Sequence, residues 1–145
     1  MEIDKNKKGK KYPPYTYDIS KEKIKEYARA AKCYDSNNFR KESFIAPPMF
    51  AVVFQIPAIE PIISDLNIDI SKVIQVKQEF EFQEVIRAGD AITTCSKITD
   101  IFDGTEFYLI TIETNSKNQN DLIVCKGEYT IIVKDKISEA QHENR

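Results

Sequence analysis

The most regular pattern of the chain lies between residues 73 and 92. Apolar and polar residues alternate through its first half, which is the period of a half-buried β-strand and not that of a helix. After this strand, Arg87-Ala88-Gly89-Asp90 predicts a tight turn, because Gly89 can adopt a positive φ. We expect Ile74, Val76, Phe80 and Phe82 on one face of the strand, and Gln75, Lys77, Glu79 and Glu81 on the other.

A second pattern, just before this strand, predicts a buried helix. The prolines at 47–48 suit a helix start, where a missing N–H has no partner to lose. Nearly every residue of 49–56 is apolar, and a helix that is apolar all round is expected to be buried on every side. We expect Pro57 and Pro61 to break this helix and a short helical piece to resume over residues 62–66.

The remaining patterns predict one more helix and several strands. Ser20 suits the N-cap of an amphipathic helix over residues 21–32, and residues 15–18 suit a short edge strand before it. Asp103-Gly104 is a hairpin signal, and Gly127 within the last strand indicates a bulge or a close backbone approach. After residue 90 we expect strands at 91–102, 106–114 and 121–134.

These elements predict an α+β fold, with one curved antiparallel sheet around a buried central helix. Such a sheet leaves an edge strand exposed, so we expect a dimer through sheet or helix. A chain of 145 residues is most simply one domain. We assign it to residues 12–135, after a disordered Lys-rich arm at 1–11 and before a polar tail at 136–145. The arm has a second interpretation, a docking patch for an acidic partner such as an acyl carrier protein or a cofactor's phosphates.

Composition narrows the function classes. A net charge of −2 argues against a nucleic-acid binder, which usually carries a basic excess. No apolar run approaches the roughly 20 residues that span a bilayer, and no signal peptide is evident. The three cysteines lack metal-ligand spacing and are expected to be reduced in a cytoplasmic protein. We expect neither a metal nor a cofactor.

Three segments, in order, carry further information. Residues 24–30 read IxxYAxA, residues 45–50 read IAPPMF, and residues 78–90 contain QEFEF followed by RAGD. Together they resemble the N-terminal MaoC-like dehydratase domain, over about residues 12–134. The resemblance implies the hot-dog fold, a central buried helix wrapped by a curved antiparallel sheet. This group contains the non-catalytic subunit of heterodimeric (3R)-hydroxyacyl-thioester dehydratases.

The resemblance implies dehydration of a 3-hydroxyacyl thioester to the trans-2-enoyl thioester, or the reverse hydration. This chemistry needs a base, an acid and N–H donors for an enolate-like oxygen. Catalytic members share an Asp-x-Asn-Pro-x-His loop between two helices, where this chain reads CYDSNN at residues 33–38. The only histidine is His142 in the tail, and the prolines at 47–48 remove two N–H donors. Both departures indicate a subunit that binds and does not catalyse.

The partners implied are a second copy of the chain or a catalytic MaoC-like hot-dog subunit, with acyl-CoA or acyl-carrier-protein thioesters as ligands. No residue is assigned a catalytic role. Arg87 is expected to order the turn with Asp90, or to meet a cofactor phosphate. The phenylalanines are expected in the core, and one or two of them as walls of an acyl channel. The candidate substrate-binding residues are Pro48, Phe50, Phe54, Phe82 and Arg87.

Two alternatives remain open. The first is a homodimeric acyl-CoA thioesterase in which Asp35 or Glu42, in the loop before the central helix, assists the attack of water. The second is a non-enzymatic protein that binds a fatty acyl ligand. Cys33 is a poor nucleophile candidate, because no histidine is available to activate it.

Overall fold

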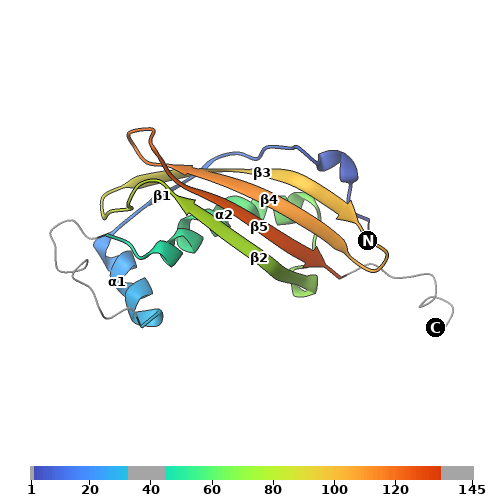
Figure 1. Cartoon of the computed structure of the whole chain (residues 1–145), viewed down its shortest axis with the longest axis horizontal. Helices are drawn as coiled ribbons and strands as arrows, with labels where there is room; N and C mark the ends of the chain where they lie inside the picture. The colour runs from blue at the N-terminus through green and yellow to red at the C-terminus, as the bar shows by residue number, and fades with distance from the viewer. Residues whose placement is uncertain (1, 33–44, 135–145) are drawn as a thin grey trace.

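A computed structural model describes residues 2–32 and 45–134 of the chain. One five-stranded antiparallel sheet, in the order β1-β3-β4-β5-β2, packs against one long helix, α2 (Figure 1). The predicted α+β plan is therefore confirmed. The strands are β1 (Tyr15–Asp18), β2 (Val73–Phe82), β3 (Ala91–Asp103), β4 (Tyr108–Lys117) and β5 (Ile123–Val133), the α-helices are α1 (Lys21–Ala30) and α2 (Ala51–Asp65), and the 3-10 turns are η1 (Lys5–Lys7), η2 (Pro48–Phe50) and η3 (Ile70–Lys72).

Local signals explain the start of α1 and the β3–β4 hairpin. The Ser20 hydroxyl accepts a hydrogen bond from the Lys23 N–H at 3.1 Å, as an N-cap residue does. Ile24 and Ala28, one turn apart, form the buried face of α1. The Gly104 N–H donates to the Phe107 carbonyl at 2.9 Å and closes the hairpin at the predicted turn.

Helix α2 differs from its prediction in two ways. It runs unbroken from Ala51 to Asp65 with Pro57 and Pro61 inside it. Pro61 is exposed and Pro57 is half-buried, so neither lies on the buried face of the helix. The helix is also not buried on every side, because Ile56 is 39% exposed. The sequence analysis did not predict the exposed side of α2, because apolar residues occur both on this side and on the side that faces the sheet.

Strand β2 departs from simple alternation at a β-bulge. Its pairing with β5 shifts register between Gln75 and Lys77, so Val76 is an extra residue. A single inserted residue reverses which face the preceding side chains take. Ile74 therefore lies on the face opposite to Phe80, and the prediction of one shared face was wrong at this position.

The core lies between α2 and the sheet and divides into two clusters. One gathers around the C-terminal half of α2 and includes Ile59, Ile62 and Tyr108. The other gathers around its N-terminal half and includes Phe50, Phe54 and Ile24 of α1. Both clusters use buried side chains of β3 and β5, and the first also uses β4, so the sheet holds α2 along its whole length.

The N-terminal segment is ordered over residues 2–11, in contrast to the predicted disordered arm. Ile3 is only 4% exposed and belongs to the core cluster around the C-terminal half of α2. The Gly9 N–H donates to the Ile98 carbonyl at 2.7 Å, which ties the segment to β3. The buried Ile3 side chain anchors the segment to the core, a contact that the high lysine content of the segment did not suggest. The predicted tail at 136–145 lies outside the described residues.

Candidate functional site

Two of the predicted substrate-binding residues, Phe50 and Phe54, lie at the start of α2 and are fully buried. Their ring centroids are 6.3 Å apart, and the Phe50 ring meets Tyr27 of α1 edge-on at 5.5 Å. Aromatic rings in such contacts fill a core and are held by their neighbours. Their position in the core agrees with the first expectation for them, and their part in an acyl channel stays a prediction.

Pro48 and Arg87 lie close to the same end of α2. Pro48 is exposed and begins the turn η2, as predicted for a proline at a helix start. An isolated bridge pairs Ile45 with Arg87, which brings the Arg87 turn beside the chain leading to Pro48. The Asp90 carboxylate accepts from the Arg87 backbone N–H at 2.9 Å. Asp90 therefore orders this turn, and the Arg87 side chain remains exposed.

Phe82 lies apart from this group, at the end of the edge strand β2. It is 40% exposed, and its ring centroid is 5.7 Å from that of Phe80. Sequence reasoning therefore selected residues from two places, the start of α2 and the sheet edge. The loop residues Asp35 and Glu42, considered for a thioesterase, lie outside the described residues.

A buried polar network surrounds Gln55 on the inner side of α2. Its Oε1 accepts hydrogen bonds from the hydroxyls of Thr114 at 2.9 Å and Tyr129 at 2.6 Å. Its Nε2 donates to the Ser116 hydroxyl at 3.0 Å, which in turn bonds Thr94 at 2.7 Å. Gln55 is fully buried, so these bonds replace the water that its amide loses on folding. Burial also raises the pKa of the Tyr129 hydroxyl, which stays protonated and donates.

Gly127 of β5 makes room for this network. A Cβ at this position would come within 2.5 Å of the Gln55 Oε1 and would also collide with the Thr114 hydroxyl. The predicted close approach at Gly127 is therefore confirmed. Cys125, two residues earlier, is buried nearby, and this burial raises the pKa of its thiol to about 12. A thiol held protonated in this way is a core residue and not a nucleophile.

An apolar groove lies on the partly exposed, outer side of α2 that borders β2, between this helix and the inner face of the sheet. Its volume is about 210 Å³, and most of its lining residues are aliphatic. The sequence analysis missed the groove because an apolar residue is expected to be buried, whether its side chain faces the core or a groove on the surface. The available signal was the recurrence of Ile56, Ile59 and Ile63 at helical spacing. The groove is lined by Ile56, Ile59, Glu60, Ile63, Ile70, Val73, Gln75, Ile112, Tyr129 and Ile131.

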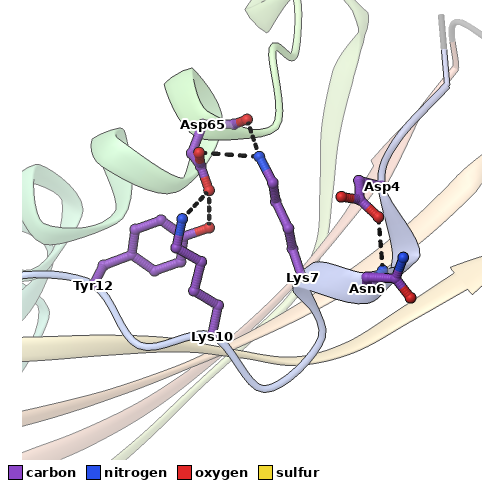
Figure 2. Close-up of polar contacts among 6 residues, drawn as sticks. All are labelled: Asp4, Asn6, Lys7, Lys10, Tyr12 and Asp65. Atoms are coloured by element: carbon purple, nitrogen blue, oxygen red, sulfur yellow. Dashed lines mark hydrogen bonds and ion pairs between the residues drawn. The ribbon is translucent and has the colours of Figure 1, made fainter.

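The last turn of α2, beside this groove, is held by the N-terminal segment. The Asp65 carboxylate receives hydrogen bonds from Lys7 at 3.0 Å, Lys10 at 2.9 Å and the Tyr12 hydroxyl at 2.7 Å (Figure 2). Lys7 also donates to the Asp65 carbonyl at 2.8 Å. The hydrogen bonds from Lys10, Tyr12 and Lys7 hold the pKa of Asp65 below its ordinary range.

The ion pairs of this segment bear on its predicted second role. Besides the pairs to Asp65, Lys5 pairs with Asp103 at 3.3 Å and Lys8 with Asp100 at 3.3 Å. Carboxylates of the same chain thus already neutralise much of the lysine cluster. This arrangement favours a structural role for the lysines, which attach the N-terminal segment to α2 and β3. Their role as a docking patch for an acidic partner stays an untested prediction.

Neither a group of metal-ligand side chains nor a membrane-spanning helix is found in the described part of the chain. Within it, no three His, Cys, Asp or Glu side chains are grouped to hold a metal ion. None of its helices is long and apolar enough to cross a membrane.

Two solved structures define the class of protein. A chain of the truncated HadBC (3R-hydroxyacyl-ACP dehydratase) complex from Mycobacterium tuberculosis matches with a TM-score of 0.75 at 20% identity, covering 87% of this chain and 96% of that chain. A MaoC-like dehydratase matches with a TM-score of 0.77 at 20% identity, covering 92% of this chain and 43% of that one. At these identities the matches establish the fold. The molecule has the hot-dog fold.

Sequence comparison then gives the family. The model described as FAS1-like, dehydratase domain region, matches residues 6–127, and the chain belongs to this family. A UPF0336 protein of Saccharopolyspora erythraea is 28% identical over 99% of both chains. Another, from Streptomyces coelicolor, is 33% identical over 88% of this chain and 84% of its own length. The resemblance to the MaoC-like dehydratase domain is therefore confirmed.

Proposed function

We propose that this chain is the acyl-binding, non-catalytic subunit of a (3R)-hydroxyacyl-thioester dehydratase. It shapes the pocket for the acyl chain, and a second hot-dog chain supplies the catalytic Asp and His. One observation carries the proposal: a dehydratase-domain sequence whose single histidine is His142, in the C-terminal tail. The HadBC complex gives a precedent, because it is a two-chain 3R-hydroxyacyl-ACP dehydratase with the same fold.

The start of α2 supports the non-catalytic role. Stabilisation of an enolate-like oxygen requires N–H donors that point at the place where the charge develops. Here the Phe50 N–H donates to the Pro47 carbonyl at 3.0 Å, and the Ala51 N–H is likewise bonded within the turn. Pro48 has no N–H. These backbone groups are therefore engaged in the turn and not directed at a ligand.

The groove between α2 and β2 is the place we assign to the acyl chain. Its aliphatic lining suits a hydrocarbon, and Glu60 at the groove supplies a polar edge. Its volume of about 210 Å³ is smaller than the roughly 300 Å³ at which ligand pockets usually begin. It is also open to solvent, because Ile56 and Ile70 of its lining are 39% and 69% exposed. A second chain beside β2 would add a wall, which agrees with a pocket completed only in the assembly.

Hydration of crotonyl-CoA tests the catalytic assignment. The chain alone is expected to show no turnover, and activity is expected once it is combined with a histidine-bearing MaoC-like chain from the same cell. Substantial activity of the chain alone would overturn the non-catalytic role. Hydrolysis of acyl-CoA, abolished by Asp35→Asn or Glu42→Gln, would instead establish the thioesterase alternative.

A bulky substitution tests the groove. Ile56→Trp, at a residue 39% exposed on α2, is expected to fill the groove and to weaken binding of a dodecenoyl thioester by about tenfold. Binding of crotonyl-CoA, with its short chain, should change little. Leu122→Trp is the matched control, because Leu122 is 50% exposed and does not line the groove. Equal effects of the two variants on titrations of the assembled complex would remove the groove assignment.

A further inference from the structure

The apolar groove beside α2 has an open side and a closed floor. On the open side, Ile56 and Ile70 are 39% and 69% exposed. The floor is formed on the sheet by Ile112, Tyr129 and Ile131, none of which is more than 7% exposed. A hydrocarbon that enters from solvent therefore passes between the exposed side chains and ends against the floor. Tyr129 is the largest side chain of these three and the one that carries a polar atom.

The alternation of side chains along β5 places Tyr129 at one end of this floor. Successive inward positions of the strand are Ile131, Tyr129 and Gly127. The first two line the groove, and Gly127 has no side chain to do so. A methyl group at Gly127 would lie 3.1 Å from Cε2 of the Tyr129 ring, so the ring extends over the glycine. The tyrosine therefore occupies the space into which the groove would otherwise continue along β5.

Two contacts fix the Tyr129 ring in this place. Its hydroxyl donates to Gln55 Oε1 at 2.6 Å, and Gln55 is itself held by the hydroxyls of Thr114 and Ser116. The Phe80 ring meets the Tyr129 ring edge-on, with the centroids 6.0 Å apart. Rotation of the ring out of the way would break the hydrogen bond and force a new rotamer in a packed core. Tyr129 is therefore a fixed wall and not a side chain that yields to a ligand.

We propose that Tyr129 sets the longest acyl chain that the groove accepts. This inference rests on the proposed function for the nature of the ligand, and it adds the residue that determines the length of that ligand. Each methylene group that enters the groove raises the affinity about fourfold until the chain reaches the tyrosine ring. Methylene groups beyond that point stay in water and add nothing. Gln55 does not line the groove and acts as a positioning residue for the ring.

Tethered hydrocarbons measure the length of the groove without any catalytic subunit. In a chain carrying Cys33→Ser and Cys95→Ser, Ile70→Cys places a thiol at the open side, and alkyl methanethiosulfonates of increasing length form a disulfide with it. We expect the melting temperature to rise by about 2 °C per methylene group and then to reach a plateau. Cys125 is fully buried and should not react. Leu122→Cys, at a position 50% exposed outside the groove, is the control for the tether and should show no dependence on length.

Substitution of Tyr129 in the tethered chain then tests the wall. Tyr129→Leu should move the plateau to longer tethers, because the next inward position of β5, about 7 Å along the strand, becomes accessible. Tyr129→Phe keeps the ring and should leave the plateau at its original length. Tyr108→Leu is the matched control, because Tyr108 is a core residue only 4% exposed that does not line the groove. A plateau that stays unchanged in Tyr129→Leu would overturn the inference.

A label at the end of the tether tests the same contact in a chain that keeps Tyr129. A tether of plateau length that ends in a diazirine should label Tyr129 or Phe80 on irradiation, as located by peptide mapping. Labelling confined to residues outside the groove would overturn the inference, even if Tyr129→Leu does not fold. Hydration of crotonyl-CoA by the assembled complex is a separate measurement. Its failure would remove the proposed function, whereas an unchanged plateau would remove this inference alone.

Discussion

Two consecutive residues of α2 show how differently its two sides are built. Gln55 is fully buried and contacts three hydroxyl groups of β4 and β5. Ile56 is 39% exposed and lines the groove beside β2. The inner side thus buries a polar residue, and the outer side exposes an apolar one. The comparison shows that the polar side chain on the inner side finds all its hydrogen-bond partners within the chain, whereas the outer side leaves an apolar side chain open to solvent.

The inner side also shows what a buried amide contributes beyond volume. Apolar contacts alone would tolerate small rotations of α2 over the sheet, because dispersion forces have no direction. Hydrogen bonds from Gln55 to Thr114, Ser116 and Tyr129 require one position of the helix. The start of α2 and the walls of the groove are therefore held at a defined place relative to the sheet.

Among substitutions that test the difference between the two sides of α2, Gly127→Ala is expected to cause the largest loss in the free energy of unfolding. The new Cβ would overlap the Gln55 Oε1 and the Thr114 hydroxyl, which cannot move away without breaking their hydrogen bond. We expect a loss of about 3 kcal/mol in the free energy of unfolding, measured by urea denaturation. Gly89→Ala is the control. Its φ is +95° with no atom within 4 Å of the added methyl, so only backbone strain of about 1 kcal/mol should appear.

A smaller effect on the free energy of unfolding, which compares the two sides of α2 directly, is expected from substituting Gln55 and Ile56 separately. Gln55→Leu leaves the buried hydroxyls of Thr114 and Tyr129 without their acceptor, at a cost of about 2 kcal/mol in the free energy of unfolding. Ile56→Asp changes an exposed side chain and should stay within about 0.5 kcal/mol of the wild type. Both can be measured in the same urea titrations. Equal losses would show that the two sides of α2 do not differ as described.

The smallest effect is expected from Asp65→Asn, and it should depend on pH. The pKa of Asp65 is held below its ordinary 3.8 in the folded chain, so ionised Asp65 stabilises the fold above about pH 5, and this contribution declines as the pH falls. The difference in unfolding free energy between wild type and variant should therefore shrink on acidification. Asp100→Asn is the control, because Asp100 and Lys8 form a solvent-exposed pair. A difference that is independent of pH would argue against an ionised Asp65 in this role.

Much of the fold could be predicted because its signals are local. The hairpin at Asp103-Gly104, the N-cap at Ser20 and the close approach at Gly127 each depend on a few neighbouring residues, and the structure confirms all three. The bounds of β1 were also predicted as observed, and β2 occupies the alternating first half of residues 73–92. Family motifs then supplied the arrangement of these elements.

The remainder depended on contacts between distant residues. The order of the N-terminal segment rests on Asp65, more than fifty residues away from Lys7. The continuity of α2 through Pro57 and Pro61 rests on which side of the helix faces outward. The groove between α2 and β2 appears only when both elements are in place. The first two features leave no pattern within a short window of sequence, and the groove leaves only the helical spacing of Ile56, Ile59 and Ile63.

The extra residue in β2 gives the strand two halves that are out of phase. Without Val76, the residues before it would exchange faces, and Ile74 would take the place of Val73 and Gln75 in the groove. The presence of Val76 therefore determines whether the Gln75 amide or the larger aliphatic side chain of Ile74 borders the groove. Deletion of this one residue would therefore change which side chains line the cavity without any substitution among residues 73–75.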